Sequence, residues 1–382
     1  MTTLRGMTWD HPRGKAPLLA LAGRSGTTGT TTVEWSARSL QAFADHPLEE
    51  LADSYDLLVL DHPHIPLAAG QELLVPLDET GHGDELDRLA AESVGASFSS
   101  YQHGDHVWAL ALDAAAQVSV HRPDLIADLP ARWDDVLELA GEGRVLWPLK
   151  PVDAMSSFLT LAAQHGEPVC SRPGTFVRRE LGLAVLDLMH RLADRVDRGC
   201  HGYNPIDVVE RLATEDAWCY APLVFGYVSY SRPGFRPHRL AYRDVPVGPR
   251  GTAGSCLGGA GIAVSAHSAE RDTAVDVAFW LASAAIQRGE YYWEGGQPAN
   301  AIAWEDPEVN ADSLDFFAGT RATLEGASVR PRHAGWIALQ EVVGDLVHAA
   351  LACQLSDDAC LDRLDAERER LLGGPEPEEM AP

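Results

Sequence analysis

The first sixty residues alternate between short apolar runs of strand length and longer segments in which apolar residues recur at helical spacing. Residues 23–32 are rich in Gly, Ser and Thr, which predicts a loop. The pattern predicts, in order, a strand over 4–9, a helix over 12–22, a strand over 31–36, a helix over 40–54 capped by Ser39, and a strand over 55–60. The last of these is apolar throughout, as a strand buried on both faces should be. This alternation predicts a doubly wound α/β domain.

The middle of the chain continues the alternation, and its last third is mostly helical in pattern. Residues 107–122 first alternate and then run apolar, which predicts a long strand pair with a turn or bend near Asp113. Further strands are predicted over 144–149, 218–230 and 257–264, and helices over 133–140, 152–165, 182–197, 205–214, 268–286, 287–293, 307–326 and 335–353. From Gly373 the chain is rich in Pro and Glu, which predicts a disordered tail.

Length and charge narrow the class of protein. The chain has 382 residues, more than one hydrophobic core usually holds, so two domains are expected. Its net charge of −26 repels phosphate backbones and anionic lipid, so we expect no nucleic-acid partner. No stretch approaches the roughly 18 apolar residues of a membrane span, so we expect no membrane insertion. Near the start, the apolar run over 17–22 is too short for a secretory signal peptide, and we therefore expect a cytoplasmic protein.

Six cysteines occur, at positions 170, 200, 219, 256, 353 and 360, and none forms a Cys-x-x-Cys pair. Zinc-binding and thioredoxin-like motifs need that spacing, so we expect free and mostly buried thiols. The sequence contains no Walker loop and no Gly-x-Ser-x-Gly motif. Gly258, Gly259 and Gly261 precede a predicted strand and not a helix, which argues against a dinucleotide site. The sequence therefore indicates no cofactor and no metal.

Four segments together resemble a known family. They are residues 55–63 (YDLLVLDHP), 107–125 (VWALALDAAAQVSVHRPDL), 258–268 (GGAGIAVSAHS) and 274–300 (AVDVAFWLASAAIQRGEYYWEGGQPAN). In order and spacing they resemble the extracellular solute-binding proteins, which serve ABC importers, often for sugars, and have the type II periplasmic-binding-protein fold. The resemblance covers about residues 3–350, and the sequence looks closest to a signal-less branch of that family.

The resemblance implies an α/β protein of two domains with a hinge, an interdomain cleft and a helical C-terminal part. Domain I would comprise residues 1–111 and 258–305, and domain II residues 112–257. Residues 306–372 would form C-terminal helices that pack on both domains, followed by the disordered tail 373–382. The family's protein partner is an ABC permease. Because the sequence shows no export signal, we expect the partner to be a small polar metabolite and rank an ABC permease second.

Two predicted strands end in the same tripeptide, Asp-His-Pro, at residues 10–12 and 61–63. Ligands of open α/β sheets bind beyond the carboxyl ends of the strands. Carboxylates there can hold hydroxyl groups, and aromatic rings can cover the apolar faces of a sugar. The opposing domain or the hinge would contribute further polar and aromatic groups. The predicted ligand-binding residues are Trp9, Asp10, His11, Arg13, Asp61, His62, Asp113, Trp147, Tyr227, Tyr230, Gly296 and Gln297.

Each of these residues also has a purely structural interpretation. Asp10 and Asp61 are good caps for the helices that follow them. His11 and His62 fit the pattern of hydrogen-bonded structural histidines, and the tryptophans suit core packing as well as ligand stacking. The sequence leaves both interpretations open.

The sequence favours a cytoplasmic solute-binding-protein homologue that closes its cleft on a small polar or sugar-like metabolite. The alternative is an enzyme on the same scaffold, in which His11, Asp61 and His62 act as acid and base. A metal-independent lyase, isomerase or hydrolase would suit those groups. Because a fold does not determine a function, the two hypotheses stand side by side.

Overall fold

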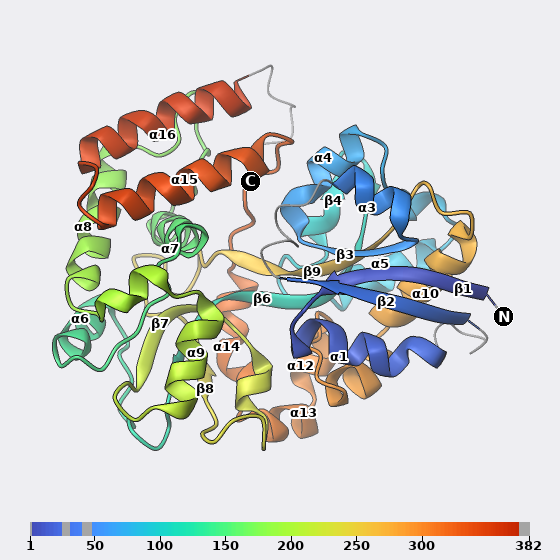
Figure 1. Cartoon of the computed structure of the whole chain (residues 1–382), viewed down its shortest axis with the longest axis horizontal. Coiled ribbons are helices and arrows are strands. Elements are labelled where there is room, and N and C mark those ends of the chain that lie inside the picture. Colours follow the sequence, from blue (N-terminus) through green and yellow to red (C-terminus); the bar gives the residue numbers. More distant parts are fainter. Residues whose placement is uncertain (1, 25–30, 40–47, 374–382) are drawn as a thin grey trace. The chain divides into compact units, whose positions relative to one another are not determined.

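A computed structural model describes residues 2–24, 31–39 and 48–373 (Figure 1). The chain divides into two compact units. Unit 1 comprises Met1–Ala115, Tyr227–Ser229 and Gly258–Ala311, and unit 2 comprises Ala116–Gly226, Tyr230–Leu257 and Asp312–Pro382. The sequence puts the domain boundaries after residues 111 and 257, whereas the units divide after 115 and 257. The C-terminal helices, predicted as a separate set from residue 306, belong to unit 2 from Asp312 onward.

Unit 1 is built on a sheet in the order β2-β1-β3-β9-β6. Its strands are β1 (Thr2–Trp9), β2 (Thr31–Arg38), β3 (Leu57–Leu60), β9 (Leu257–Val264) and the first half of β6 (Leu110–His121). β1 runs parallel to β2 and to β3, while β9 runs antiparallel to β3. β9 approaches β6 so closely that a Cβ on Gly259 would lie 2.3 Å from the carbonyl oxygen of Asp113. The predicted strands over 4–9, 31–36, 55–60 and 257–264 are confirmed.

Both faces of the unit 1 sheet are covered, as the doubly wound prediction requires. Leu57 and Val59 face a core shared with α1 (Pro12–Leu21) and α10 (Arg271–Ala282). Leu58 and Leu60 face the opposite core, shared with α3 (Leu48–Ser54) and α4 (Ile65–Gly70). Figure 1 shows α1 on the side of the sheet opposite to α3 and α4. This two-sided burial explains why β3 is apolar at all four positions.

Smaller elements complete unit 1. They are α5 (Gly83–Ala91), the hairpin β4 (Gln102–His103) and β5 (His106–Val107), α11 (Ala284–Ile286), the π-helical η7 (Gln287–Tyr291), α12 (Ala301–Glu305) and α13 (Pro307–Asp312). The predicted helix over 40–54 is described only as α3, because residues 40–47 lie outside the described part of the chain. The predicted helix over 307–326 is wrong in one respect. It breaks into α13 and α14 where Leu314 and Asp315 adopt positive φ values of 52° and 57°.

Unit 2 is a helical layer around a short antiparallel sheet. The second half of β6 pairs with β7 (Tyr220–Phe225) and with β8 (Ala241–Arg243). The helices are α6 (Trp133–Gly141), α7 (Pro151–Gln164), α8 (Arg179–Ala193), α9 (Pro205–Thr214), α14 (Phe316–Glu325), α15 (Trp336–Leu351) and α16 (Asp357–Leu372). α7 is the central helix, since every residue from Asp153 to Gln164 is buried. α15 packs on α7 and on α16.

Two strand predictions need correction. Residues 107–122 do not form a strand pair with a turn near Asp113, because β6 continues unbroken from Leu110 to His121. The predicted strand over 144–149 is reduced to a single bridge between Val145 and Tyr220, and Pro148 lacks the amide that a longer ladder would need.

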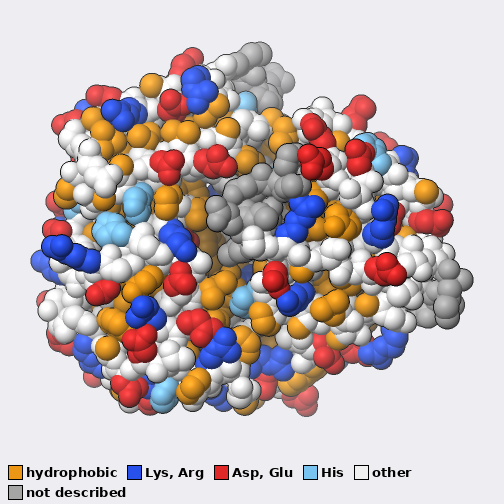
Figure 2. All heavy atoms as spheres, in the orientation of Figure 1, with side chains coloured by type: hydrophobic (Ala, Val, Ile, Leu, Met, Phe, Trp, Pro, Cys, Tyr) orange, Lys and Arg blue, Asp and Glu red, His pale blue; other side chains and the backbone are white. Residues whose placement is uncertain are grey.

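The surface agrees with the composition. Acidic side chains are spread over the face shown in Figure 2, with basic ones interspersed among them. All six cysteines are free thiols and five of them are buried, as predicted. Within the described ranges, no helix combines the length and the hydrophobicity needed to cross a bilayer. The predicted tail lies outside the described residues from position 374 onward.

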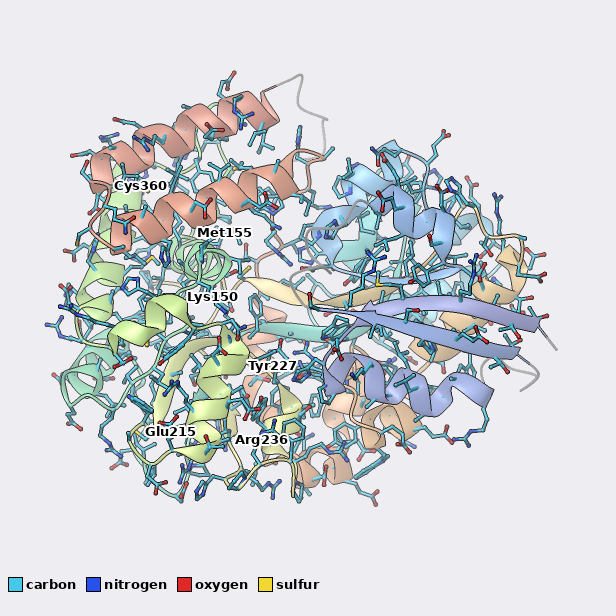
Figure 3. All side chains as sticks on the ribbon, viewed as in Figure 1. Lys150, Met155, Glu215, Tyr227, Arg236 and Cys360 are labelled. Atoms are coloured by element: carbon cyan, nitrogen blue, oxygen red, sulfur yellow. The ribbon has the colours of Figure 1, made fainter. Side chains whose placement is uncertain are left out.

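One carboxyl group, that of Asp153, is buried in the core of unit 2, where its ionised form lowers the stability of the fold. Asp153 lies in the first turn of α7, between Lys150 and Met155, which are labelled in Figure 3. The residue is 3% exposed, and its Oδ2 atom has no hydrogen-bond partner among the described residues. Burial raises the pKa of Asp153 to about 8, Lys150 opposes the shift and Asp207 adds to it. The folded state therefore favours the protonated acid.

We predict that Asp153→Asn stabilises the protein. In the wild type the protonated carboxyl contributes fully only below its unfolded-state pKa of about 3.9, and that contribution is lost as the pH rises to about 8. Asparagine cannot ionise, so the melting temperature of the variant should exceed that of the wild type by a margin that widens between pH 4 and pH 8. Melting curves across this range test the prediction, with Glu138→Gln on the exposed side of α6 as the control. A margin that shrinks with rising pH would contradict it.

Candidate functional site

The two Asp-His-Pro tripeptides meet at one edge of the unit 1 sheet. β1 and β3 are parallel neighbours, with Gly6 opposite Leu57 and Met7 opposite Leu58. Asp10 is the residue after β1, and Asp61 is the residue after β3. Both follow the carboxyl ends of their strands, where open α/β sheets bind ligands. The structure therefore brings together the two chain segments that the sequence singled out.

The capping interpretation holds for one aspartate and fails for the other. Asp61 accepts a hydrogen bond from the backbone amide of His62 at 2.9 Å and caps the short 3₁₀ turn η2 (His62–His64). The cap of α1 is His11, whose Nδ1 accepts a hydrogen bond from the amide of Arg13 at 3.1 Å. Asp10 is exposed and pairs with Lys15. Accepting at Nδ1 places the proton of a neutral His11 ring on Nε2.

Arg13 and Asp113 form a buried ion pair that links α1 to β6. The Nε atom of Arg13 donates to Oδ2 of Asp113 at 2.7 Å, and a second guanidinium nitrogen donates to Oδ1. Arg13 is only 5% exposed and Asp113 2%. Burial alone would lower the pKa of Arg13, but the Asp113 carboxylate outweighs it and raises the pKa. Burial raises the pKa of Asp113, Arg13 opposes the rise, and the nearby charge of Asp61 adds to it.

Tyr227 covers this pair from a different part of the chain. Its ring centroid lies 4.7 Å from the central guanidinium carbon of Arg13, in cation–π geometry, and 4.8 Å from the ring of His11, edge to face. Tyr291 is fully buried near the same two charges. Burial and the Asp113 carboxylate raise the pKa of Tyr291 well above the usual range. Arg13, Asp113, His11 and Tyr227 thus form one cluster behind the strand ends.

His62 faces other neighbours. Its ring is buried edge to face against Tyr101, at 6.4 Å between centroids, and its Nδ1 lies 3.2 Å from Oδ1 of Asp61. His11 faces Tyr227, so the two imidazoles have separate aromatic neighbours. Within the described ranges, no three His, Cys, Asp or Glu side chains lie close enough together to hold a metal ion.

Three other predicted residues of unit 1 have structural contacts. Trp9 packs in the core with α1 and α10, which agrees with its alternative interpretation. Gly296 lies against the ring of Tyr291, where a Cβ would come within 2.3 Å of a ring carbon. Gln297 is fully buried, and backbone groups use both ends of its amide.

The two predicted residues of unit 2 also have structural partners. Trp147 is fully buried, and its indole nitrogen donates to Oγ of Ser157 at 3.1 Å. Tyr230 is buried, and its hydroxyl donates to Oε1 of Glu210 at 2.6 Å. Burial followed by the Glu210 carboxylate raises the pKa of Tyr230. The polar group of each side chain forms a hydrogen bond within the protein.

Sequence reasoning missed Tyr101 and Tyr291. Both are buried beside predicted site residues, Tyr101 against His62 and Tyr291 within the field of Arg13 and Asp113. No local motif marks either tyrosine. The one available signal was the glycine opposite each ring, since Gly261 and Gly296 leave room for Tyr101 and Tyr291 respectively.

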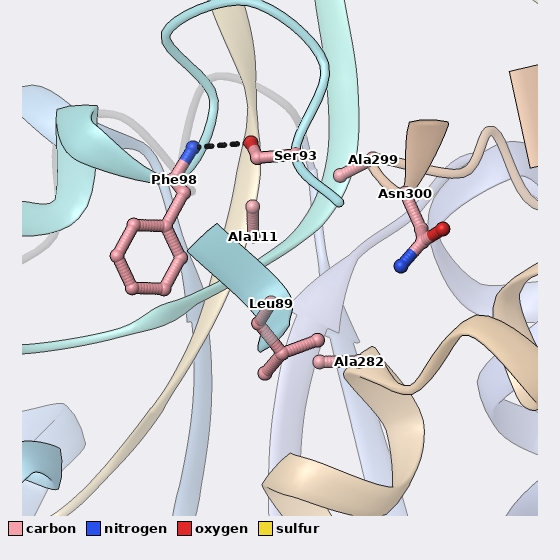
Figure 4. Close-up of a pocket in the computed structure, with 7 residues that line it drawn as sticks. All are labelled: Leu89, Ser93, Phe98, Ala111, Ala282, Ala299 and Asn300. Carbon is pink, nitrogen blue, oxygen red and sulfur yellow. Dashed lines mark hydrogen bonds between the residues drawn. The ribbon is translucent and has the colours of Figure 1, made fainter. Parts of the chain in front are cut away.

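A small cavity in unit 1 is separate from this cluster. It is lined by Leu89, Ser93, Phe98, Ala111, Ala282, Ala299 and Asn300 (Figure 4). Its volume of about 10 Å³ admits about one water molecule and no metabolite. The backbone amide of Phe98 donates to Ser93 at its rim, at 2.9 Å. None of the predicted ligand-binding residues lines it.

We predict that the Arg13–Asp113 pair is worth far more to folding than the exposed Asp10–Lys15 pair. Asp113→Ala leaves a buried guanidinium without its counter-charge, which should cost about 3–5 kcal/mol of unfolding free energy. Lys15→Met should cost less than about 1 kcal/mol. Urea unfolding followed by circular dichroism measures both. The double variant Arg13→Met with Asp113→Leu should lose less than Asp113→Ala alone, and equal losses for Asp113→Ala and Lys15→Met would contradict the prediction.

The chain matches no protein-family model. Solved structures do match it over nearly the whole length of both chains. MalE3 from T. maritima, with maltose bound, gives a TM-score of 0.83 at 19% identity and covers 97% of this chain and 100% of that one. An ABC transporter solute-binding protein from Agrobacterium radiobacter K84, in complex with ribitol, gives 0.80 at 19% identity, covering 97% and 98%.

The GacH receptor of Streptomyces glaucescens, solved unliganded and with acarbose, gives a TM-score of 0.80 at 17% identity, covering 98% of this chain and 100% of that one. Identities this low show the fold. The sequence resemblance is thereby confirmed at the level of the fold, and the chain has the two-domain periplasmic-binding-protein fold of the ABC transporter solute-binding proteins.

Proposed function

We propose that this protein binds a small sugar or polyol, and that the carboxyl edge of the unit 1 sheet supplies part of the binding site. The observation that carries the proposal is a pair of carboxylates, Asp10 and Asp61, each of which directly follows one of two neighbouring parallel strands. They occur in a chain whose fold is that of sugar- and polyol-binding proteins.

Carboxylates suit a ligand rich in hydroxyl groups. An ionised carboxylate offers two acceptor oxygens and forms stronger hydrogen bonds than a neutral group. Asp10 is exposed and the Asp61 side chain is 26% exposed, so both retain access to solvent. The cluster of Arg13, Asp113 and Tyr227 is buried, and the ion pair between Arg13 and Asp113 holds it together. Preorganised groups hold a ligand at a lower cost in conformational entropy.

The ligands of the similar structures support this class of ligand. Besides maltose and ribitol, D-mannitol is bound in a protein from Agrobacterium vitis and alpha-D-tagatose in one from Thermotoga lettingae, at TM-scores of 0.77 and 0.79. These ligands are neutral and differ in size, but all carry hydroxyl groups on adjacent carbon atoms. Binding of such a compound by this chain is the simplest use of its fold and of its paired carboxylates.

The remaining expectations stay predictions. We keep an ABC permease partner and a cytoplasmic location as proposals. The enzyme alternative needs His11, Asp61 and His62 to act on one substrate. His11 uses Nδ1 to cap α1 and packs against Tyr227, whereas His62 packs against Tyr101. These contacts favour binding over acid–base chemistry as the role of the edge.

We predict measurable binding of at least one compound in a panel of maltose, ribitol, D-mannitol and tagatose. Asp61→Asn keeps an oxygen able to cap η2, so the fold should persist, but it removes the charge that strengthens hydrogen bonds to hydroxyls. Affinity should fall about tenfold, by roughly 1.4 kcal/mol. Isothermal titration calorimetry gives the affinities.

The matched control is Asp87→Asn, which removes an exposed carboxylate on α5 of the same unit. It should bind like the wild type. No heat and no thermal shift with any compound of the panel would contradict sugar binding. Equal affinities for the wild type and Asp61→Asn would place the ligand away from this edge.

A further inference from the structure

The segment Tyr227–Ser229 belongs to unit 1, although the residues on both sides of it belong to unit 2. The Gln297 side chain bonds to the backbone of this segment. The amide of Val228 donates to Oε1 of Gln297 at 2.9 Å, and Nε2 of Gln297 donates to the carbonyl oxygen of Ala114 at 2.7 Å. Gln297 therefore fastens this segment to β6.

The Val228 amide needs such an acceptor. Val228 is the first residue of the 3₁₀ turn η6 (Val228–Ser231), and the first amides of a helix have no partner within it. A buried amide without an acceptor costs about 1–3 kcal/mol. Gln297 is fully buried and supplies the acceptor. Both ends of the Gln297 amide bond to backbone groups, so we expect the residue to affect a ligand through the position of the segment that it holds.

Gln297 is itself rigidly held. It follows Gly295, which has a φ of +109°, and Gly296, which lies flat against the Tyr291 ring. The next residue, Pro298, forms a bridge with Asp113 of β6. These features constrain the backbone on both sides of Gln297, and the two hydrogen bonds hold its side chain.

Two adjacent residues of β6 hold Tyr227 from two directions. The Asp113 side chain binds Arg13, whose guanidinium lies under the Tyr227 ring. The Ala114 carbonyl binds Gln297, which holds the backbone next to Tyr227. The ring and the backbone of this segment therefore share one anchor in the sheet.

We propose that Gln297 is a positioning residue for ligand binding, which acts by holding Tyr227 over His11 and Arg13 at the carboxyl edge of the unit 1 sheet. The inference rests on the proposed function, in that it assigns Tyr227 a place in the sugar site. It replaces the direct ligand contact that the sequence suggested for Gln297.

A ligand-free measurement tests the anchoring. Gln297→Met keeps the length of the side chain and removes both hydrogen bonds. Hydrogen exchange of the peptide 226–231, followed by mass spectrometry, should become roughly fivefold faster or more in this variant. The control is Gln164→Met, which removes an equally buried glutamine of unit 2 bonded to Trp133 and Pro246. Unchanged exchange at 226–231 in Gln297→Met would overturn the inference even if the wild type binds a sugar.

A double-mutant cycle tests whether the effect on binding passes through Tyr227. With the compound of the panel that binds the wild type, Gln297→Met should weaken affinity about fivefold. In a Tyr227→Leu background the same substitution should have almost no further effect. An equal loss in both backgrounds would show that Gln297 acts independently of Tyr227 and would overturn the proposal. If no compound binds the wild type, the proposed function fails while the exchange experiment still decides the anchoring.

A second pair of variants serves if Gln297→Met does not fold. Val228→Pro removes the donor amide at the first position of η6, where proline is tolerated, and Val228→Ala keeps that amide. The proline variant should show faster exchange in the peptide around residue 228 and weaker binding than the alanine variant. Equal behaviour of the two would overturn the role of Gln297.

Discussion

The buried ion pair between Arg13 and Asp113 is the constraint on which the rest of the site depends. Neither charge could remain in a dry interior alone, because each would face the desolvation cost without compensation. The pair therefore fixes the first turn of α1 against β6. Tyr227 lies over the guanidinium, and the residue after Asp113 anchors Gln297. The ion pair and the neighbouring Ala114 carbonyl together hold α1, Tyr227 and Gln297 against β6.

Parallel pairing of β1 with β3 brings the other residues of the proposed site to one edge of the sheet. It places Asp10 and Asp61 beyond the carboxyl ends of two neighbouring strands, and both carboxylates are accessible to solvent. A ligand rich in hydroxyl groups needs hydrogen-bond acceptors with two properties: a fixed position and access to solvent. Strand ends supply the first property because the hydrogen-bonded ladder fixes them, and the turns that follow supply the second.

Hydrophobic patterning was enough to predict the doubly wound unit, because each buried strand and each helix face leaves a periodic trace in the sequence. It failed at Asp113, where a polar residue within an apolar run predicted a turn. The charge is instead satisfied by Arg13, one hundred residues away, and no local pattern can show this. Trp147 and Tyr230 illustrate a related limit, since a buried aromatic ring with its polar group bonded to the protein has the same sequence appearance as a ligand-stacking one. The cap of α1 is His11 and not Asp10, the residue that the sequence suggested for it.

The most direct test of the central claim is a crystal structure of the protein saturated with the sugar or polyol that it binds most tightly. Ligand hydroxyl groups should lie within hydrogen-bond distance of the carboxylate of Asp10 or Asp61, with the Arg13–Asp113 pair intact behind them. A ligand that touches no residue following β1 or β3 would show that the paired carboxylates serve the fold and not the binding site.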